Sequence, residues 1–189
     1  MPNEQDGKIV LTDPRAIRAL AHPARLAIIE ALLPGGELTA TECASLTGLS
    51  PSATSYHLKA LARWGIVEHG EARADGRDRP WKARGRAIEV SSDASPQTAL
   101  AEAAMLEVFL DRNRALATQF LEHQASEPAE WWDLMELANV DYWLTAAELA
   151  ETSAALRRVL EPYEQRRADS RPDQSRRVRI SRLIVPHVE

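Results

Sequence analysis

Hydrophobic residues recur at helical spacing in the first part of the chain. The segment RAIRALAHPARLAIIEALL, residues 15–33, follows Asp13 and Pro14, which are a capping residue and a proline suited to the first helical position. Because proline interrupts a helix interior, we expect Pro23 to divide the segment into two helices. A Gly-Gly pair then ends the second of them.

Two shorter helices are predicted next. Thr39 and Glu42 have the spacing of a capping box, so a helix is expected from Thr39 to about residue 47, with Gly48 as its left-handed exit. Ser50 is followed at once by proline and opens a helix over residues 50–64. Two short helices joined through a glycine form a helix-turn-helix unit, whose second helix enters the DNA major groove.

One face of the expected helix 50–64 is polar and has no predicted internal partner. Thr54, Leu58 and Leu61 fall on the inner face, and His57 is expected there as a core histidine. The outer face carries hydroxyl groups, one aromatic ring and two basic side chains: Ser52, Ser55, Tyr56, Lys59 and Arg63. Such a row is often a solvated surface, but beside a second capped helix it is interpreted as the face that contacts bases and phosphates.

After Gly65 the pattern changes to two strand-like runs around Asp75-Gly76, which is a hairpin-turn sequence. The pattern predicts a wing over residues 66–84 that follows the expected recognition helix directly. Its basic residues either face solvent or, as we expect, bind the phosphate backbone: Arg73, Arg77, Arg79 and Lys82.

A long helix is predicted from Ser95-Pro96 to about His123. Apolar positions that step alternately by four and three form a seam typical of a helix that pairs with a second copy. The seam consists of Ala99, Ala103, Leu106, Leu110, Asn113, Ala117 and Phe120. Asn113 either sets the register across a dimer or faces solvent.

Aromatic residues gather after Pro128, at Trp131, Trp132, Tyr142 and Trp143. They are either core residues or the lining of a pocket for a small-molecule effector. A capping box at Thr145 opens one more helix, to about residue 160. Arginine and aliphatic residues then alternate over residues 176–185, which predicts a half-buried edge strand.

These patterns predict a mostly α fold with a small β-hairpin wing, in the α+β class. We expect an N-terminal tail at residues 1–13 and a winged helix-turn-helix DNA-binding domain at 14–90. A helical dimerisation and effector region, with the C-terminal strand, is expected at 91–189.

Charge is distributed unevenly along the chain. The net charge of −5 divides into −2 over residues 1–13, +3 over 14–90, −10 over 91–165 and +4 over 166–189, so the expected recognition helix lies in a basic part of an acidic protein. The single Cys43 cannot form an internal disulfide and is expected to be a buried apolar residue rather than a redox switch. No stretch has the apolar length of a membrane span or the layout of a signal peptide, so we expect a cytoplasmic protein with no membrane partner.

The chain resembles the ArsR-type winged helix-turn-helix repressors. The resemblance rests on ALAHPARLAIIEALL, on Leu49-Ser50, on the run from Ser55 to Lys59, and on the Gly65-Ile-Val sequence before the basic wing. It covers residues 14–90. It implies a homodimer that binds double-stranded DNA at a pseudo-palindromic operator, with recognition helices entering successive major grooves about 34 Å apart.

The resemblance also raises the question of a metal ion. Thr39 and Thr41 stand where metal-sensing members have cysteines, and Asn113 and Gln124 stand where a second type of site has histidines. Zinc requires nitrogen or thiolate ligands in a closed set, so the sequence predicts no metal and no other cofactor.

Three functions remain to be compared. The leading one is a sequence-specific transcriptional regulator, a homodimeric repressor that reads DNA with helix 50–64 and the wing. The alternative is a winged-helix protein-interaction module without specific DNA binding. An enzyme ranks lowest, because no G-x-G-x-x-G sequence follows residue 90 and no nucleophile is paired with a base.

Overall fold

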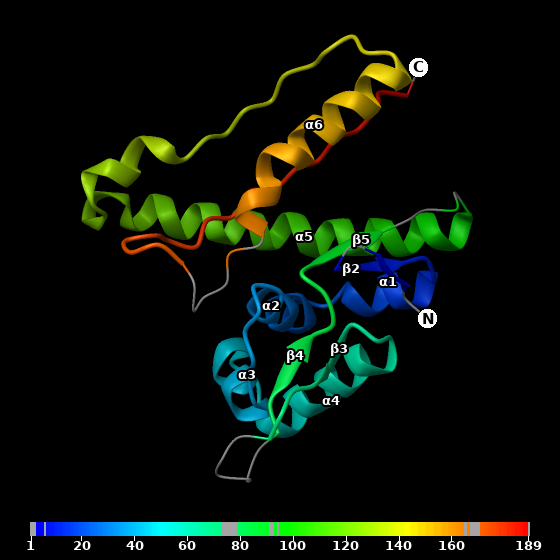
Figure 1. Ribbon diagram of the computed structural model, residues 1–189, viewed down its shortest axis with the longest axis vertical. Helices are drawn as coiled ribbons and strands as arrows, with labels where there is room; N and C mark the ends of the chain where they lie inside the picture. The colour runs from blue at the N-terminus through cyan, green and yellow to red at the C-terminus, as the bar shows by residue number, and fades with distance from the viewer. Residues whose placement is uncertain are drawn as a thin grey trace.

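The computed structural model describes residues 3–5, 7–72, 79–90, 93, 95–164, 166 and 171–188. The helices are α1 (Pro14–Leu20), α2 (Pro23–Leu32), α3 (Ala40–Thr47), α4 (Pro51–Arg63), α5 (Pro96–His123) and α6 (Ala146–Glu164), with 3-10 helices at Gln124–Ser126 and Ala129–Leu134. The strands are β1 (Asn3–Gln5), β2 (Lys8–Leu11), β3 (Val67–His69), β4 (Trp81–Ala83) and β5 (Ala87–Val90). The long helix α5 lies between α1–α4 on one side and α6 on the other (Figure 1).

The helices begin at the capping residues that the sequence predicts. The Thr39 N–H donates to Glu42 Oε2 (2.6 Å), and the Glu42 N–H donates to Thr39 Oγ1 (3.2 Å), which completes the capping box of α3. Gly48 ends α3 with a φ of 69°. Ser50 Oγ accepts from the Ala53 N–H (3.2 Å) at the start of α4. The predicted helix-turn-helix is therefore confirmed at both helices.

Two small sheets accompany the helices. β3 and β4 pair antiparallel and form the base of the predicted wing. The other sheet has the order β1-β2-β5, with β2 parallel to β5 and Ile9 opposite Ile88. The described part of the expected tail at residues 1–13 is therefore a part of the folded domain, because Ile9 and Leu11 of β2 are buried in its core.

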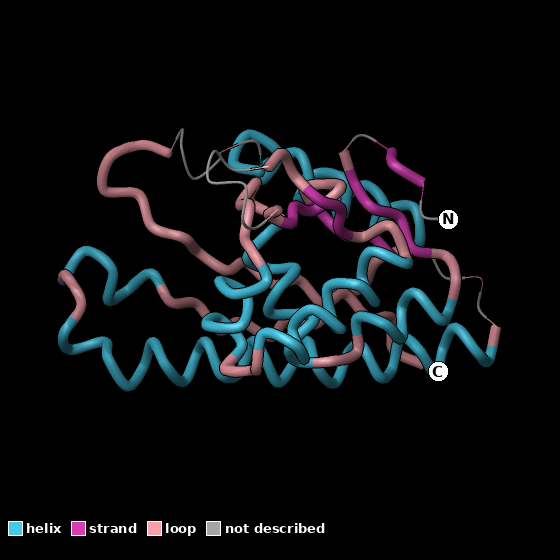
Figure 2. The backbone as a smooth tube through the Cα atoms, turned by 90° about the horizontal axis from the view of Figure 1, so that it is seen from below, coloured by secondary structure: helices cyan, strands magenta, loops and turns pink. Residues whose placement is uncertain are grey.

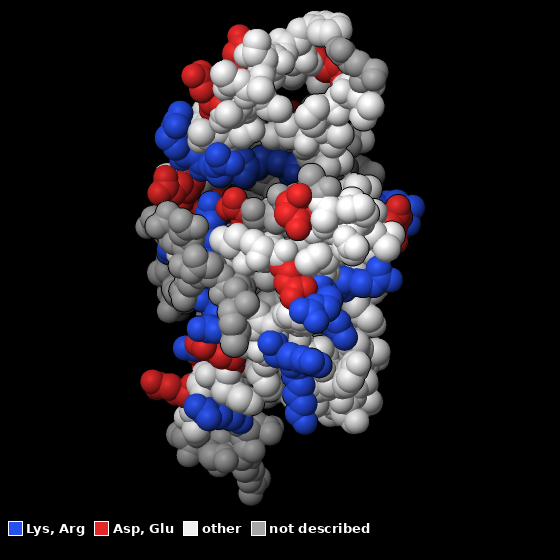
Figure 3. Space-filling view, turned by 90° about the vertical axis from the view of Figure 1, so that its right-hand side faces the viewer, with Lys and Arg blue, Asp and Glu red and all other residues white. Residues whose placement is uncertain are grey.

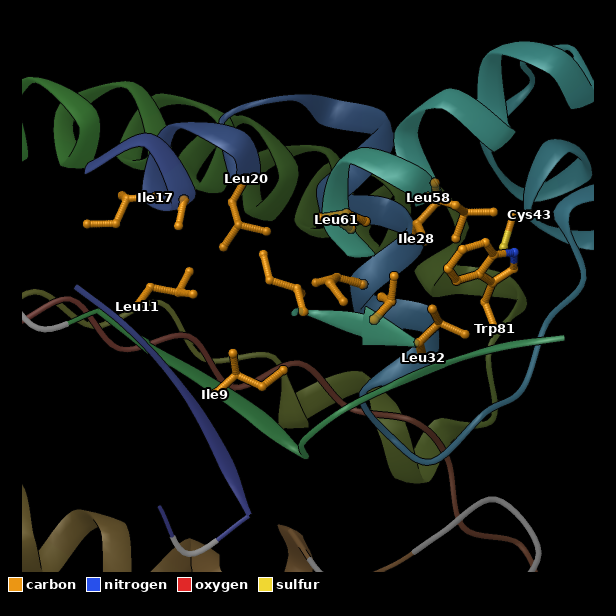
Figure 4. Close-up of a cluster of buried hydrophobic side chains, with 14 of the residues drawn as sticks. Ile9, Leu11, Ile17, Leu20, Ile28, Leu32, Cys43, Leu58, Leu61 and Trp81 are labelled. Atoms are coloured by element: carbon orange, nitrogen blue, oxygen red, sulfur yellow. The ribbon is translucent and has the colours of Figure 1, made fainter. Parts of the chain in front are cut away.

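The hydrophobic core lies under α4, where side chains from β2, α1, α2, α4 and β4 meet (Figure 4). Ile17, Ile28, Leu58 and Leu61 are fully buried there. Cys43 is buried too, as expected, and burial raises the pKa of its thiol to about 11. The inner face of α4 thus packs on the core and leaves the opposite face of the helix outward.

Burial ends early in α5. Thr98 and Ala101 are buried against the domain, and Met105 is packed against its core, but no described residue after Ala101 is buried. Figure 2 shows α5 running along the length of the molecule, with the strands all on one side of it. The second half of the chain therefore contributes almost nothing to the core of this single chain.

The C-terminal strand expected at residues 176–185 is absent, and this part of the prediction is wrong. Burial does not alternate there, because residues 176–180 are all exposed, Val178 by 64% and Ile180 by 60%. Arg177 donates to the Glu30 carbonyl oxygen, and Arg179 Nη1 donates to Glu30 Oε1 (2.6 Å). Arg179 thus pairs with the buried carboxylate of Glu30 on α2 and Arg177 binds the backbone of the same residue, and the segment is joined to no strand by a β-ladder.

The observed fold is mostly helical with a small β wing, which confirms the predicted class. It is a winged helix-turn-helix domain extended by α5, α6 and a C-terminal segment without regular secondary structure.

Candidate nucleic-acid interface

The outer face of α4 is open to solvent in the single chain. Ser52, Tyr56, Lys59 and Arg63 are exposed along it, and Ser55 is half-buried. Pro51 at the first helical position and the Ser50 cap fix where this face begins. All five predicted contact residues thus share one accessible surface, while their contact with DNA stays a prediction.

A cleft of about 480 Å³ lies beside this face, between α1, α2 and α4. We call it the basic cleft; its lining is Arg15, Arg18, Ala19, Arg25, Tyr56, Lys59, Ala60, Arg63 and Trp64. Five cationic side chains therefore surround one hollow, and Lys and Arg side chains gather below the middle of the face shown in Figure 3. Sequence reasoning missed the three arginines of α1 and α2, because nothing in their spacing shows that these helices meet α4.

Arg15 is held at the edge of the basic cleft. Its Nη2 pairs with Asp13 Oδ2 at 2.8 Å, and its guanidinium lies 5.6 Å from the centre of the Trp64 ring. The side-chain hydrogen bond from Arg15 is the main cause that lowers the pKa of the Asp13 carboxyl. Asp13, which also caps α1, thus fixes the position of a cation near α4.

Arg25 is held deeper in the basic cleft. Its Nη1 donates to the Ala19 carbonyl oxygen (2.9 Å), and its Nε donates to His57 Nδ1 (3.3 Å). His57 is buried as predicted, and its ring lies 4.4 Å from that of His22. Burial, with the nearby charges of His22 and Arg25, lowers the pKa of His57, which favours the neutral ring that accepts from Arg25.

Three cations of the basic cleft have no acidic partner within the part of the chain that the structure describes. Arg18 projects from α1, and Lys59 and Arg63 project from α4, all of them exposed. Unpaired, convergent positive charge attracts polyanions and releases condensed counterions when it binds nucleic acid. These three side chains can therefore each take a phosphate.

The wing carries the remaining predicted contacts. Arg73 and Arg77 lie outside the described residues. Arg79 Nε donates to the Gly70 carbonyl oxygen (2.9 Å), and Lys82 Nζ lies 3.5 Å from Glu68 Oε1. Arg79 and Lys82 thus both interact with residues of the wing itself, and their contact with phosphates stays a prediction.

The predicted seam of α5 is largely uncovered in the single chain. Ala99, Ala103, Leu106 and Leu110 are exposed, the two leucines by 38% and 43%. Asn113, Ala117 and Phe120 are half-buried. Asn113 Oδ1 accepts from Ser181 Oγ (2.9 Å), so Asn113 has a partner within its own chain.

The four aromatic residues are exposed or half-buried in the single chain, and their role as core residues or as the lining of an effector pocket stays a prediction. Tyr142 and Trp143 are 74% and 98% exposed on a segment without helix or strand. Trp132 Nε1 donates to the Glu127 carbonyl oxygen (2.7 Å), and Trp131 stacks 4.9 Å from Arg176. None of the four is buried in the single chain.

The described residues contain no group of three or more His, Cys, Asp or Glu side chains placed to hold a metal ion. No described helix is long and apolar enough to cross a membrane.

Comparison with known proteins identifies the class of the domain. Residues 20–70 match a family described as "Helix-turn-helix domain". Over 66 residues the chain is 41% identical to a probable mercury resistance operon repressor of Streptomyces lividans, a match that covers 35% of this chain and 50% of that protein. The chain thus spans about half the length of this relative.

Two solved structures align with part of the chain. One is the homodimeric winged helix-turn-helix DNA-binding domain of a possible ArsR-family transcriptional regulator from Mycobacterium bovis, with 27% identity, 58% and 81% coverage of the two chains and a TM-score of 0.33. The other is reduced HlyU from Vibrio cholerae, with 26% identity, 48% and 83% coverage and a TM-score of 0.32.

The chain therefore carries a winged helix-turn-helix domain. The similarity of its helix-turn-helix to a probable repressor agrees with the ArsR-type resemblance found in the sequence. The chain has a single cysteine, and its burial favours the protonated thiol.

Proposed function

We propose that this protein is a transcriptional regulator that binds double-stranded DNA with α4 and the basic cleft. The observation that carries the proposal is the continuity of the two surfaces: Tyr56, Lys59 and Arg63 belong to the outer face of α4 and also line the cleft. One docking movement can therefore bring hydroxyl and aromatic groups to base edges and cations to the adjoining phosphates.

The dimensions and charge of α4 support this docking. A helix of 13 residues is about 20 Å long, and the major groove of B-DNA admits an α-helix. Ser52 and Ser55 are near its N-terminal end, which is the end that contacts bases in helix-turn-helix proteins. The net charge of −10 over residues 91–165 repels DNA from the other side of the molecule, which favours approach through the basic cleft.

The regulator is proposed to act as a homodimeric repressor at a pseudo-palindromic operator. The uncovered leucines of α5 support pairing, and the name of the Streptomyces lividans relative supports repression. In this proposal residues 7–90 form the DNA-binding unit and residues from 95 onward form the dimerisation region. Such a regulator acts in the cytoplasm, where bacterial chromosomal DNA lies, and the proposal assigns it no catalytic step.

Fluorescence anisotropy tests the proposal directly. The full-length protein is titrated against DNA from upstream of its own gene and against a scrambled fragment, at low and at physiological salt. We expect a preference for the native fragment that survives physiological salt, since specific contacts remain when counterion release is weakened. Weak binding to both fragments that disappears with salt would contradict specific DNA binding and favour a protein-interaction module.

A pair of variants assigns the binding surface. Lys59→Ala removes an unpaired cation of the basic cleft and is expected to weaken binding to the native fragment at least tenfold when both protomers carry it. Arg158→Ala is the matched control, because Arg158 is exposed on α6 and does not line the basic cleft. Equal affinities for the two variants would show that DNA docks elsewhere.

A further inference from the structure

A second hollow lies between strands β2 and β5 on one side and helix α6 on the other. Its volume is about 580 Å³, within the range of roughly 300–1,000 Å³ that is typical of small-molecule sites. We call it the α6 hollow; residues 7–8 and 86–89, five residues of α6 and Arg182 line it. It shares no lining residue with the basic cleft, so the two hollows are separate features of the molecule.

The lining of the α6 hollow includes four arginines that have no acidic partner within the described part of the chain: Arg86, Arg157, Arg158 and Arg182. Lys8 differs from them, because its Nζ pairs with Glu89 Oε2 at 3.4 Å. The unpaired arginines of α6 are notable because residues 91–165 contain fourteen acidic and only four basic residues. The other two basic residues of that region, Arg112 and Arg114, both pair with a carboxylate.

Arg86 is positioned by the backbone beside it. Its N–H donates to the Gly7 carbonyl oxygen (2.7 Å). A Cβ atom at Gly7 would lie 3.0 Å from Arg86 Nη2, and a Cβ atom at Gly85 would lie 2.8 Å from the Gly7 carbonyl oxygen. Gly7 also has a φ of 73°, which favours glycine. The two glycines thus let the chain cross itself closely and leave room for the Arg86 guanidinium at the edge of the hollow.

The other arginines come from two further elements. Arg182 follows Arg179, whose ion pair with Glu30 at 2.6 Å fixes the C-terminal segment on α2. Arg157 and Arg158 project from α6, and the small side chain of Ala154, one turn earlier, lines the hollow beside them. Three elements that are distant in the sequence thus bring guanidinium groups to one hollow, and a ligand there would contact both the winged domain and its helical extension.

We propose that the α6 hollow binds a small organic molecule that carries two or more anionic groups, either carboxylate or phosphate. The planar fork of a guanidinium group matches both kinds of oxyanion. Ala87, Ile88 and Ala154 add apolar surface for the body of such a molecule. This inference goes beyond the proposed function, because it holds irrespective of what α4 binds.

The charges around the hollow favour a small anion over nucleic acid. Glu161 and Glu164 line it as well, although its basic residues outnumber its acidic ones by five to three. The net charge over residues 91–165 is −10, so a polyanion that extended beyond the hollow would be repelled by the surrounding region. A small ligand avoids this repulsion, because it contacts the arginines without covering the acidic surface outside.

Isothermal titration calorimetry of the full-length protein tests the proposal without DNA. The two probes are citrate, which carries carboxylates, and inorganic pyrophosphate, which carries phosphates, with ionic strength held constant by chloride. We expect at least one probe to bind with a dissociation constant below about 1 mM, since several charge-assisted contacts act together. Binding of citrate alone would support a carboxylate ligand, and binding of pyrophosphate alone would support a phosphate ligand.

Three variants locate the bound probe. Arg86→Ala and Arg157→Ala each remove one guanidinium, from opposite sides of the α6 hollow, and each is expected to weaken binding by about tenfold or more. Both arginines are exposed and lack an acidic partner among the described residues, so the urea midpoint should stay unchanged. Arg18→Ala is the matched control, because it removes an exposed arginine that lines the basic cleft instead. It should change the affinity for the probe by less than about twofold.

Three results would overturn the proposal. The first is that neither probe binds with a dissociation constant below about 1 mM. The second is that Arg18→Ala weakens binding while Arg86→Ala and Arg157→Ala do not, which would place the anion in the basic cleft. The third is that only one of Arg86→Ala and Arg157→Ala has an effect, because the ligand would then not span the hollow. None of these results bears on whether α4 binds DNA.

Discussion

Replacing Arg18 with alanine is expected to reduce the salt dependence of DNA binding while leaving the preference for sequence intact. Arg18 lies on α1, outside the helix-turn-helix, and its exposed side chain lines the basic cleft. It has no acidic partner within the described residues, so its full charge is available to a phosphate. Because α1 is not the groove-reading helix, the substitution removes charge without removing a base contact.

The magnitude follows from the number of unpaired cations. Counting the basic cleft alone and leaving out the wing, Arg18, Lys59 and Arg63 give three phosphate contacts per protomer and six per dimer, which contribute a slope of log K against log salt of about −5.4. Affinity then falls about 2,000-fold between 50 and 200 mM salt. In the Arg18→Ala dimer four contacts remain, the slope becomes about −3.6, and the loss over the same range is about 150-fold.

Anisotropy titrations at four or more salt concentrations measure both slopes on the same DNA. Arg158→Ala on α6 serves as the control and should keep the wild-type slope. An unchanged slope for Arg18→Ala would refute the assignment of the basic cleft to phosphate binding. If Arg18→Ala lost the preference for the native fragment over the scrambled one, this would refute the claim that α1 binds phosphates while α4 alone contacts the bases.

Three further predictions concern stability and assembly. Glu30→Gln removes the carboxylate that pairs with Arg112 and Arg179. We expect it to lower the free energy of unfolding in urea by about 2 kcal/mol, less than for a fully buried pair because both arginines are partly exposed. An unchanged urea midpoint would contradict this. Leu106→Glu with Leu110→Glu is expected to give a monomer by light scattering, and a dimer mass would show that the seam is misplaced. Since burial lowers the pKa of His57 in the folded state, the unfolded state binds more protons just below pH 6.5, and stability falls as pH falls there. His57→Gln should flatten the dependence of urea midpoints between pH 7.5 and 5.5, and an equally steep loss would assign it to other groups.

Local sequence features were enough to predict most of the DNA-binding domain. Asp13, Thr39, Ser50 and Ser95 cap helices through hydrogen bonds within two or three residues, so their effect is visible in the sequence alone. The inner face of α4 followed from helical periodicity, which also placed His57 inside.

Features that depend on distant residues were missed or wrong. β2 is four residues long and is held by β5, almost eighty residues away, so its alternating Ile9 and Leu11 were the single local indication of a strand. The C-terminal alternation was interpreted with apolar residues inward, because a local pattern cannot show that Glu30 of α2 lies opposite Arg179. The arginines of α1 and α2 in the basic cleft were missed for the same reason.

The most direct test of the central claim is selection of DNA from a random pool by the full-length protein, at physiological salt, followed by the same selection with Tyr56→Ala. We expect the wild-type protein to enrich a pseudo-palindrome whose half-sites lie about one helical turn, or a multiple of it, apart. The variant should lose discrimination at defined positions of each half-site, because Tyr56 is exposed on the outer face of α4. A wild-type selection that enriches no sequence would contradict the account.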